Sequence, residues 1–326
     1  MAAFFSSLDE IIEKEDASEG VNLPSRDLTQ FGIFWRRFRT HPAAFLALGV
    51  LVLFALMAIF APQITPGVTP NTDFFLRINA SFQPHAPSLD DFPNRIFGNV
   101  AYDDFDRLRR SVLTEVTFGA RVSLTVSFGA GVLAAGIGII FGTLSGYFGG
   151  WLDALFMRLT DIFLAIPFLP LVATIVILAP VQIGSVQSIT LLFALVGWPS
   201  IARLVRANFL LLREQAFTEA ARAQGVGSLR IAFRHLLPNV LPTIMTAFTS
   251  TIALFLVTEA TLDFLTIGVT TQMTWGNAFY TSYADVVSGS WWAILFPGLA
   301  IVLTVLAVNT VGEALRDALD VRGHAL

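Results

Sequence analysis

The sequence contains no cysteine and a single lysine, Lys14, among its 326 residues. The absence of cysteine excludes disulfides, thiol nucleophiles and Cys-ligated metals. A Walker A loop needs Gly-Lys followed by Ser or Thr to hold phosphates, whereas Lys14 is followed by Glu15. The chain therefore carries no nucleotide site of this kind.

Histidine is also scarce. The four histidines have neither HExxH nor another ligand spacing, and no His, Asp or Ser set stands at catalytic spacing. They are His41, His85, His235 and His324. We therefore expect no catalytic residue, no metal site and no resident cofactor, and the chain is not predicted to be an enzyme.

Charge is the third scarcity. Only 13% of the residues are charged, about half the share usual in a soluble globular chain, whereas 55% are hydrophobic. One soluble core of this size could not hide so much apolar surface. Long uncharged runs indicate that lipid is the solvent for much of it. The composition predicts an integral membrane protein.

The N-terminal segment, 1–41, is acidic and has no ordinary secretory signal. We interpret it as a cytoplasmic tail or a short surface helix. The first apolar run lies between Pro42 and Pro62, and its nineteen uncharged residues span about 28 Å as a helix, enough for one membrane crossing. An aromatic and arginine cluster at 34–39 precedes it, which places the N-terminus inside.

Further apolar segments predict an all-α membrane protein with six transmembrane helices and both termini in the cytoplasm. The runs are 42–62, 120–147, 155–179, 187–211, 238–268 and 291–312. The predicted units are the N-terminal segment 1–41, the first helix 42–62, an extracytoplasmic segment 63–112, a five-helix core 113–315 and a cytoplasmic tail 316–326. The core includes a basic inside loop, 203–237, which supports this orientation. Trp275 and the pair Trp291-Trp292 are expected in an outer interfacial belt.

The second predicted span carries a stripe of small residues every four positions. Its members are Ala130, Ala134, Gly138, Gly142, Gly146 and Gly150. On a helix this spacing makes a nearly straight strip without side chains, along which another helix can approach closely. The stripe predicts helix packing rather than chemistry, and no long internal repeat of the secondary-transporter kind is present.

The inside loop has the geometry of a protruding helix-turn-helix. Residues 210–224 favour a helix with small side chains, and Gly225 permits a reversal through positive φ. Residues 229–236 allow a second short helix, after which Pro238 suits the first turn of the next span. An ordinary basic loop would not need this spacing. We expect a docking knob on the inner face.

The amino-acid sequence of this loop resembles the EAA motif of ABC-importer permease subunits. The matching residues are Glu219, Ala220, Ala221, Gly225, His235 and Pro238, the last two within FRHLLPN. Similar motifs occur in the segments 119–124, 158–167, 275–277, 296–301 and 309–320. The resemblance runs from about residue 30 to 322 and is greatest to the C-type subunit of dipeptide, oligopeptide and nickel permeases.

The resemblance implies the type I importer permease fold in the bacterial inner membrane. It also implies a role for the loop as the coupling helix that fits an ATPase. The expected partners are a homologous second permease subunit, two ATPase subunits that bind ATP and Mg²⁺, an extracytoplasmic substrate-binding protein and the lipid bilayer, with no nucleic acid. The chain would then form half of a pathway for di- or oligopeptides.

Two stretches depart from the family's pattern, and both lie toward the predicted outer mouth. In the outer segment, residues 97–106 stand where the family has an FGTD-x-x-GRD-like stretch. Residues 262–268 read LDFLTIG where the family has LSFLGLG. These differences leave the substrate open. Nickel chelates, glutathione, sugars or another small solute remain alternatives within the family; a stand-alone secondary transporter or channel and an intramembrane enzyme are alternatives outside it.

Two pairs of charged residues within the predicted spans are close in sequence. Glu259 and Asp263 lie four apart on one helix face near the outer end of the fifth span. Since ionisable groups at membrane depth usually face a cavity or a partner, these two are candidates to line an outer vestibule and meet a cationic solute group; interfacial placement with water access is the alternative. Arg158 and Asp161 are expected to pair with each other as a structural contact.

Overall fold

A computed structural model describes residues 41–65, 86–88, 97, 99–101, 110–179, 184–287 and 289–319. Nearly all of them are helical. The predicted acidic segment 1–41 falls outside the described residues except for His41, as do most of the outer segment 63–112 and the end of the tail. The only strands within the described ranges are β1 (Asn99–Ala101) and β2 (Arg110–Ser111), which pair antiparallel.

In the part of the chain that the structure describes, five helices are long and apolar enough to cross a membrane. They are α3 (Pro42–Ile59), α5 (Val112–Phe148), α9 (Val186–Leu212), α12 (Leu237–Phe264) and α14 (Trp292–Leu319). The bent pair α6 (Gly150–Leu164) and α7 (Phe168–Leu178) makes a sixth span if it is counted as one. The predicted all-α membrane fold is therefore confirmed.

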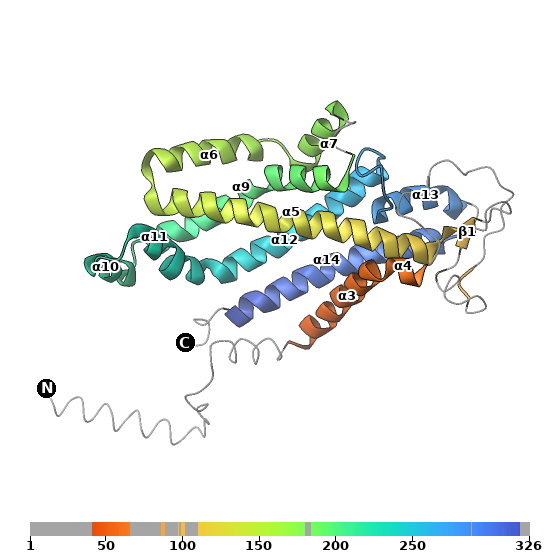
Figure 1. Ribbon diagram of the computed structural model, residues 1–326, viewed down its shortest axis with the longest axis horizontal. Helices are drawn as coiled ribbons and strands as arrows, with labels where there is room; N and C mark the ends of the chain where they lie inside the picture. The colour runs from red at the N-terminus through yellow and green to blue at the C-terminus, as the bar shows by residue number, and fades with distance from the viewer. Residues whose placement is uncertain are drawn as a thin grey trace, which may run out of the picture.

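The third predicted span is broken rather than continuous. Its two helices, α6 and α7, meet at 81°, and Pro167 lies between them as the cap residue of α7. A residue that precedes proline is disfavoured in the helical region, and proline cannot donate to the preceding turn, so the helix ends there. In Figure 1, α6 runs back along α5 and α7 turns away from it.

The small-residue stripe packs α5 against α9, as predicted, except at Gly150, which begins α6 and whose added Cβ would meet nothing within 4 Å. A Cβ atom added to Gly142 would lie 2.5 Å from the carbonyl oxygen of Ala202 and 2.7 Å from Cβ of Val205. Gly146 and Gly138 meet the next turns of α9 in the same way, which leaves no room for a side chain at these positions. The two backbones therefore approach closely along most of α9, and α5 becomes the central helix of the bundle (Figure 1).

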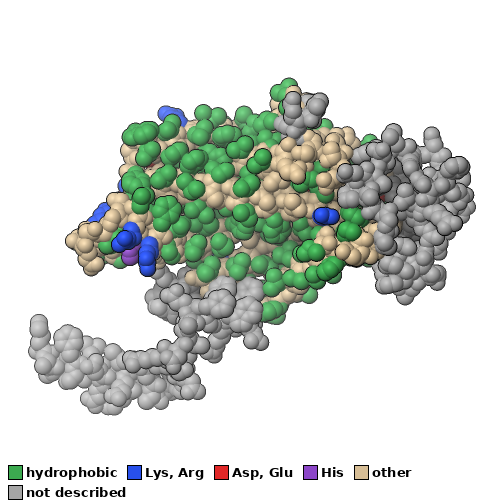
Figure 2. All heavy atoms as spheres, viewed as in Figure 1, with side chains coloured by type: hydrophobic (Ala, Val, Ile, Leu, Met, Phe, Trp, Pro, Cys, Tyr) green, Lys and Arg blue, Asp and Glu red, His purple; other side chains and the backbone are tan. Residues whose placement is uncertain are grey.

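The other helices surround this pair. The first span, α3, packs on α14 through Ala44, Ala314 and Ala318, and α14 packs on α12. Figure 2 shows hydrophobic side chains over the length of the helices, with basic side chains gathered at the end that carries α10. Many large apolar residues remain exposed, among them Leu46 at 75% and Ile162 at 65%. Such a surface suits lipid rather than water.

Candidate functional site

A helical knob protrudes at one end of the bundle, between α9 and α12 (Figure 1). It consists of α10 (Ala216–Ala223), α11 (Ser228–Arg230) and the π-helical turn η1 (Ile231–Leu236), which leads directly into α12. We call residues 213–236 the knob. The predicted loop of 203–237 begins too early, because α9 continues to Leu212 and contains Arg203 and Arg206.

The predicted helix over 210–224 is also interrupted. Gln215 is extended, with φ −79° and ψ 147°, and serves as the N-cap residue of α10. The hydroxyl of Thr218 donates to the carbonyl oxygen of Leu212 at 2.8 Å, which satisfies an acceptor that the end of α9 leaves open. The break turns α10 out of the axis of α9 and gives the knob its separate direction.

Gly225 makes the reversal that the sequence predicts. Its φ is +77°, and its N–H donates to the carbonyl oxygen of Arg222 at 2.9 Å. The N–H of Val226 donates to the carbonyl oxygen of Ala221 at 3.1 Å, so the two bonds form a Schellman motif at the end of α10. An added Cβ on Gly225 would meet nothing within 4 Å, so the glycine is required here for its backbone and not for space within the chain.

Most of the predicted coupling residues are exposed. Glu219, Ala220, Gly225 and His235 are exposed, Ala221 is half-buried, and Pro238 is exposed in the first turn of α12, where the sequence placed it. The knob also exposes Phe217 at 39%, Leu229 at 58% and Phe233 at 41%. These apolar groups stand on a projection that carries Arg222, Arg230 and Arg234, so they form a mixed apolar and basic surface suited to a protein partner.

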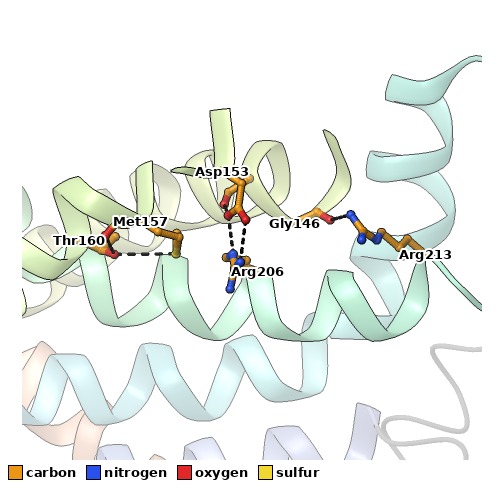
Figure 3. A network of polar contacts seen from close by, with 7 residues as sticks. Gly146, Asp153, Met157, Thr160, Arg206 and Arg213 are labelled. Atoms are coloured by element: carbon orange, nitrogen blue, oxygen red, sulfur yellow. Dashed lines mark hydrogen bonds and ion pairs between the residues drawn. The ribbon is translucent and has the colours of Figure 1, made fainter. Parts of the chain in front are cut away.

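The base of the knob is tied to the neighbouring helices by polar contacts (Figure 3). The guanidinium of Arg206 in α9 donates to both carboxylate oxygens of Asp153 in α6, at 2.5 and 2.6 Å. The hydroxyl of Ser145 in α5 donates to the same carboxylate. At the start of the knob, Arg213 donates to the carbonyl oxygen of Gly146 at 3.4 Å. Arg213 thus bonds the start of the knob to α5, and the other contacts join α5, α6 and α9 to one another directly below it.

Two further contacts hold the same region. Arg222 of α10 lies over the ring of Tyr147, 5.6 Å from its centroid. Arg203 donates to Asp161 at 2.6 Å, so α9 is bound to α6 a second time. The predicted pairing of Asp161 with Arg158 is not found among the described contacts, because the partner of Asp161 comes from the adjacent helix and not from the same one.

Glu259 and Asp263 lie at the other end of the bundle, inside the chain. Each is 1% exposed, so neither lines an open vestibule in this conformation, contrary to the expectation from sequence. Ser123 of α5 donates to Glu259 Oε1 at 2.9 Å, and the N–H of Val269 donates to Asp263 Oδ1 at 2.6 Å. Through these bonds the two carboxylates fasten α5 and the loop after α12 to α12 itself.

The segment after this loop forms a helix that the sequence did not reveal. No long apolar run in the sequence predicts this helix, α13 (Trp275–Val287). Trp275 is fully buried, its indole N–H donates to the carbonyl oxygen of Val116 at 2.9 Å, and its backbone N–H reaches Ser123 Oγ at 3.3 Å. The expectation of an interfacial belt is therefore wrong for Trp275 and for Trp292, which is 8% exposed, whereas Trp291 is 56% exposed.

Five long apolar helices with a bent sixth pair, a small-residue seam and an exposed helical knob at one end define, within the described ranges, a polytopic membrane protein. The search for groups of three or more His, Cys, Asp or Glu side chains that could hold a metal found none within the described ranges. Residues 138–322 match the family model of the binding-protein-dependent transport system inner membrane component. Residues 29–86 match the N-terminal TM domain of oligopeptide transport permease C.

Similar proteins extend over almost the whole chain. The dipeptide transport system permease protein DppC of Alkalihalophilus pseudofirmus is 36% identical over 88% of this chain and 88% of its own. DppC of Bacillus subtilis is 31% identical over 94% and 90%, and the glutathione transport system permease protein GsiD of Escherichia coli is 36% identical over 91% and 92%.

A solved structure shares the fold. The inward-facing MetNI methionine ABC transporter superposes with a TM-score of 0.51 at 22% identity, covering 63% of this chain and 96% of that one. The chain belongs to the family of binding-protein-dependent transport system inner membrane components, as a C-type permease subunit of a peptide-type ABC importer. It is thus a multi-pass inner membrane protein, and its membership implies partners that supply ATP hydrolysis and bind solute.

Proposed function

We propose that this chain forms one half of the pathway of a di- or oligopeptide importer and that its knob receives the motion of an ATPase subunit. The observation that carries the coupling role is the exposure of Glu219, Ala220 and His235 on a projection that Arg213 bonds to α5, beside the contacts that join α5, α6 and α9. A force applied to the knob would reach the central helix pair through these contacts.

The complete transporter in this proposal has a homologous second permease subunit, two ATPase subunits that hold ATP and Mg²⁺, and a solute-binding protein outside. ATP-driven closure of the ATPases moves the two knobs, and the pathway between the permeases opens toward the binding protein. The basic residues Arg222, Arg230 and Arg234 on the knob support a cytoplasmic position for this end. With six crossings, both termini would lie on the same side.

Peptides are the proposed solutes because both kinds of relative carry peptide-like names, dipeptide for DppC and glutathione for GsiD. Glutathione is itself a short peptide, and GsiD is as similar to the chain as DppC of Alkalihalophilus pseudofirmus. Glutathione import is therefore the second candidate function. Nickel chelates and other small solutes remain alternatives for the same subunit.

Ala220→Trp tests the coupling role in the complete complex, reconstituted in proteoliposomes. Ala220 is exposed on the knob, so a bulky ring there leaves the packing of the spans intact while it obstructs a docked partner. We expect ATP-dependent uptake of a labelled dipeptide or of glutathione to be lost while the chain still inserts and pairs with the second permease.

Ala207→Trp is the matched control, because Ala207 is exposed on the apolar surface of α9, outside the knob. Uptake by this variant should equal that of the unaltered complex. Normal uptake by Ala220→Trp would contradict the coupling role. Uptake of neither a dipeptide nor glutathione by the unaltered complex would contradict the proposed substrate class.

A further inference from the structure

Arg121 is an exposed cation at the end of the bundle opposite the knob. It lies in the third turn of α5, within a helix that crosses the membrane. Within the described ranges its side chain has no ion-pair or hydrogen-bond partner, although an ionisable group at such a position ordinarily pairs or faces water. No residue of the described ranges therefore occupies the guanidinium, which can bind a ligand from outside the chain.

A cavity of about 640 Å³ begins at this arginine and runs between α3 and α5. Its walls are apolar apart from Arg121 and Thr125, and the hydroxyl of Thr125 is already bonded to the carbonyl oxygen of Arg121 at 2.6 Å. The apolar lining includes Leu51, Val52 and Ala55 of α3 and Leu124 and Phe128 of α5. We call this cavity the α3–α5 groove.

The groove has its charge at one end only. Arg121, Leu124 and Phe128 recur at helical spacing and so share one face of α5, over which the groove extends about 10 Å along the helix axis. Ile59, the last residue of α3, also borders the groove, which places its charged end near the membrane surface. From there the lining is apolar toward the middle of the bilayer.

We propose that the α3–α5 groove binds one anionic phospholipid, with an acyl chain along its walls and the headgroup phosphate on Arg121. The polarity of the groove follows that of a lipid, whose charged end lies at the surface and whose chain points inward. Arginine forms planar, charge-assisted hydrogen bonds to phosphate oxygens. The apolar walls exclude water, so a bound chain gains contact along the whole groove.

The α3–α5 groove therefore fixes the first span to the central helix through lipid. Within the membrane, the surrounding bilayer supplies this ligand at high concentration. A transmembrane helix of the second permease is the competing occupant, and it would need a carboxylate of its own to pair with Arg121. This inference depends on residence in the membrane and is independent of the knob's proposed role.

The test compares spin-labelled phosphatidylglycerol with spin-labelled phosphatidylcholine around the reconstituted complete complex. The anionic lipid should be immobilised preferentially, and Arg121→Gln should reduce that preference about fivefold at low salt, with a smaller loss at high salt. Arg158→Gln is the matched control: Arg158 is also exposed, has no ion-pair partner among the described residues and does not border this groove. The control should keep the full preference.

Two further variants separate the possible occupants. Ala55→Phe fills the groove without altering charge and should reduce the immobilised fraction of both lipids. Because the chain has no cysteine, Val52→Cys gives a single reactive site in the groove. The proposal would be overturned by crosslinking of Val52→Cys to the second permease or by an unchanged lipid preference in Arg121→Gln. Neither result bears on the coupling role, which is tested separately by uptake in Ala220→Trp and its control Ala207→Trp.

Discussion

At the scale of single residues, two helix ends use the same motif with different residues. Both α10 and α12 end in a Schellman motif; Gly225 occupies the positive-φ position in the first and Thr266 in the second, with φ +61°. Thr266 is the only non-glycine residue with positive φ in the described ranges, and it stands where the family's LSFLGLG pattern has glycine. A β-branched side chain is strained in this conformation.

Thr266→Gly should therefore stabilise the protein, by about 1 kcal/mol, because the relief of left-handed strain exceeds the added freedom of the unfolded chain. The Thr266 side chain is exposed, so little packing is lost. The measurement is the thermal unfolding midpoint of the purified complex. Thr270→Gly, at an exposed position without positive φ, should lower that midpoint instead. A lower midpoint for Thr266→Gly would contradict the strain assignment.

Asp263 is a second residue at which this region differs from the family's LSFLGLG pattern. Its carboxylate accepts the N–H of Val269, while Gly276 packs on Asp263 and on the backbone of Ala260. The loop after α12 is thereby closed on α12 and α13 by contacts from within the chain. This loop lies where the sequence departs from the family's LSFLGLG pattern.

At the scale of helices and strands, the α5–α9 seam determines which contacts are possible. Gly142 approaches backbone atoms of α9, whereas Gly136, on the opposite side of α5, would place an added Cβ in open space. The same helix thus contains glycines with opposite requirements. Only those on the packed face are needed for close approach.

Gly142→Ala should destabilise the complex by about 1–3 kcal/mol, because α5 and α9 must move apart to admit one methyl group. Gly136→Ala should be neutral or stabilising, since alanine favours the helix and meets no neighbour. Chemical unfolding of the two variants in the same detergent measures the difference. Equal losses in both would show that helix propensity, and not the seam, governs these sites.

Much of this architecture could be predicted because a long apolar run by itself indicates a membrane-spanning helix. The seam was predictable from the spacing of Gly138, Gly142 and Gly146, and the turn from Gly225. Three features could not be predicted because they depend on which helices pack together, and a local sequence pattern does not contain this information. They are the break before α7, the helix α13 and the partner of Asp161. Burial of Trp275 has the same origin, since an isolated tryptophan gives no sign of which helix will cover it.

At the scale of the whole molecule, the two ends of the bundle differ in character. One end projects the knob, which Arg213 bonds to α5 next to the Asp153–Arg206 contact that joins α6 to α9. The other end is closed by buried polar contacts around Ser123, Glu259 and Asp263. In our account the first end receives movement from an ATPase, and the second must rearrange when the pathway opens outward.

Site-specific crosslinking of the knob tests this account most directly, since the natural chain contains no cysteine. Ala220→Cys places one thiol on the exposed face of α10, and Ala207→Cys places one on the exposed surface of α9. In the assembled complex, a short thiol-to-amine crosslinker should join Ala220→Cys to an ATPase subunit and leave Ala207→Cys unjoined. Absence of an ATPase product from Ala220→Cys in a complex that hydrolyses ATP and imports solute would contradict the coupling role.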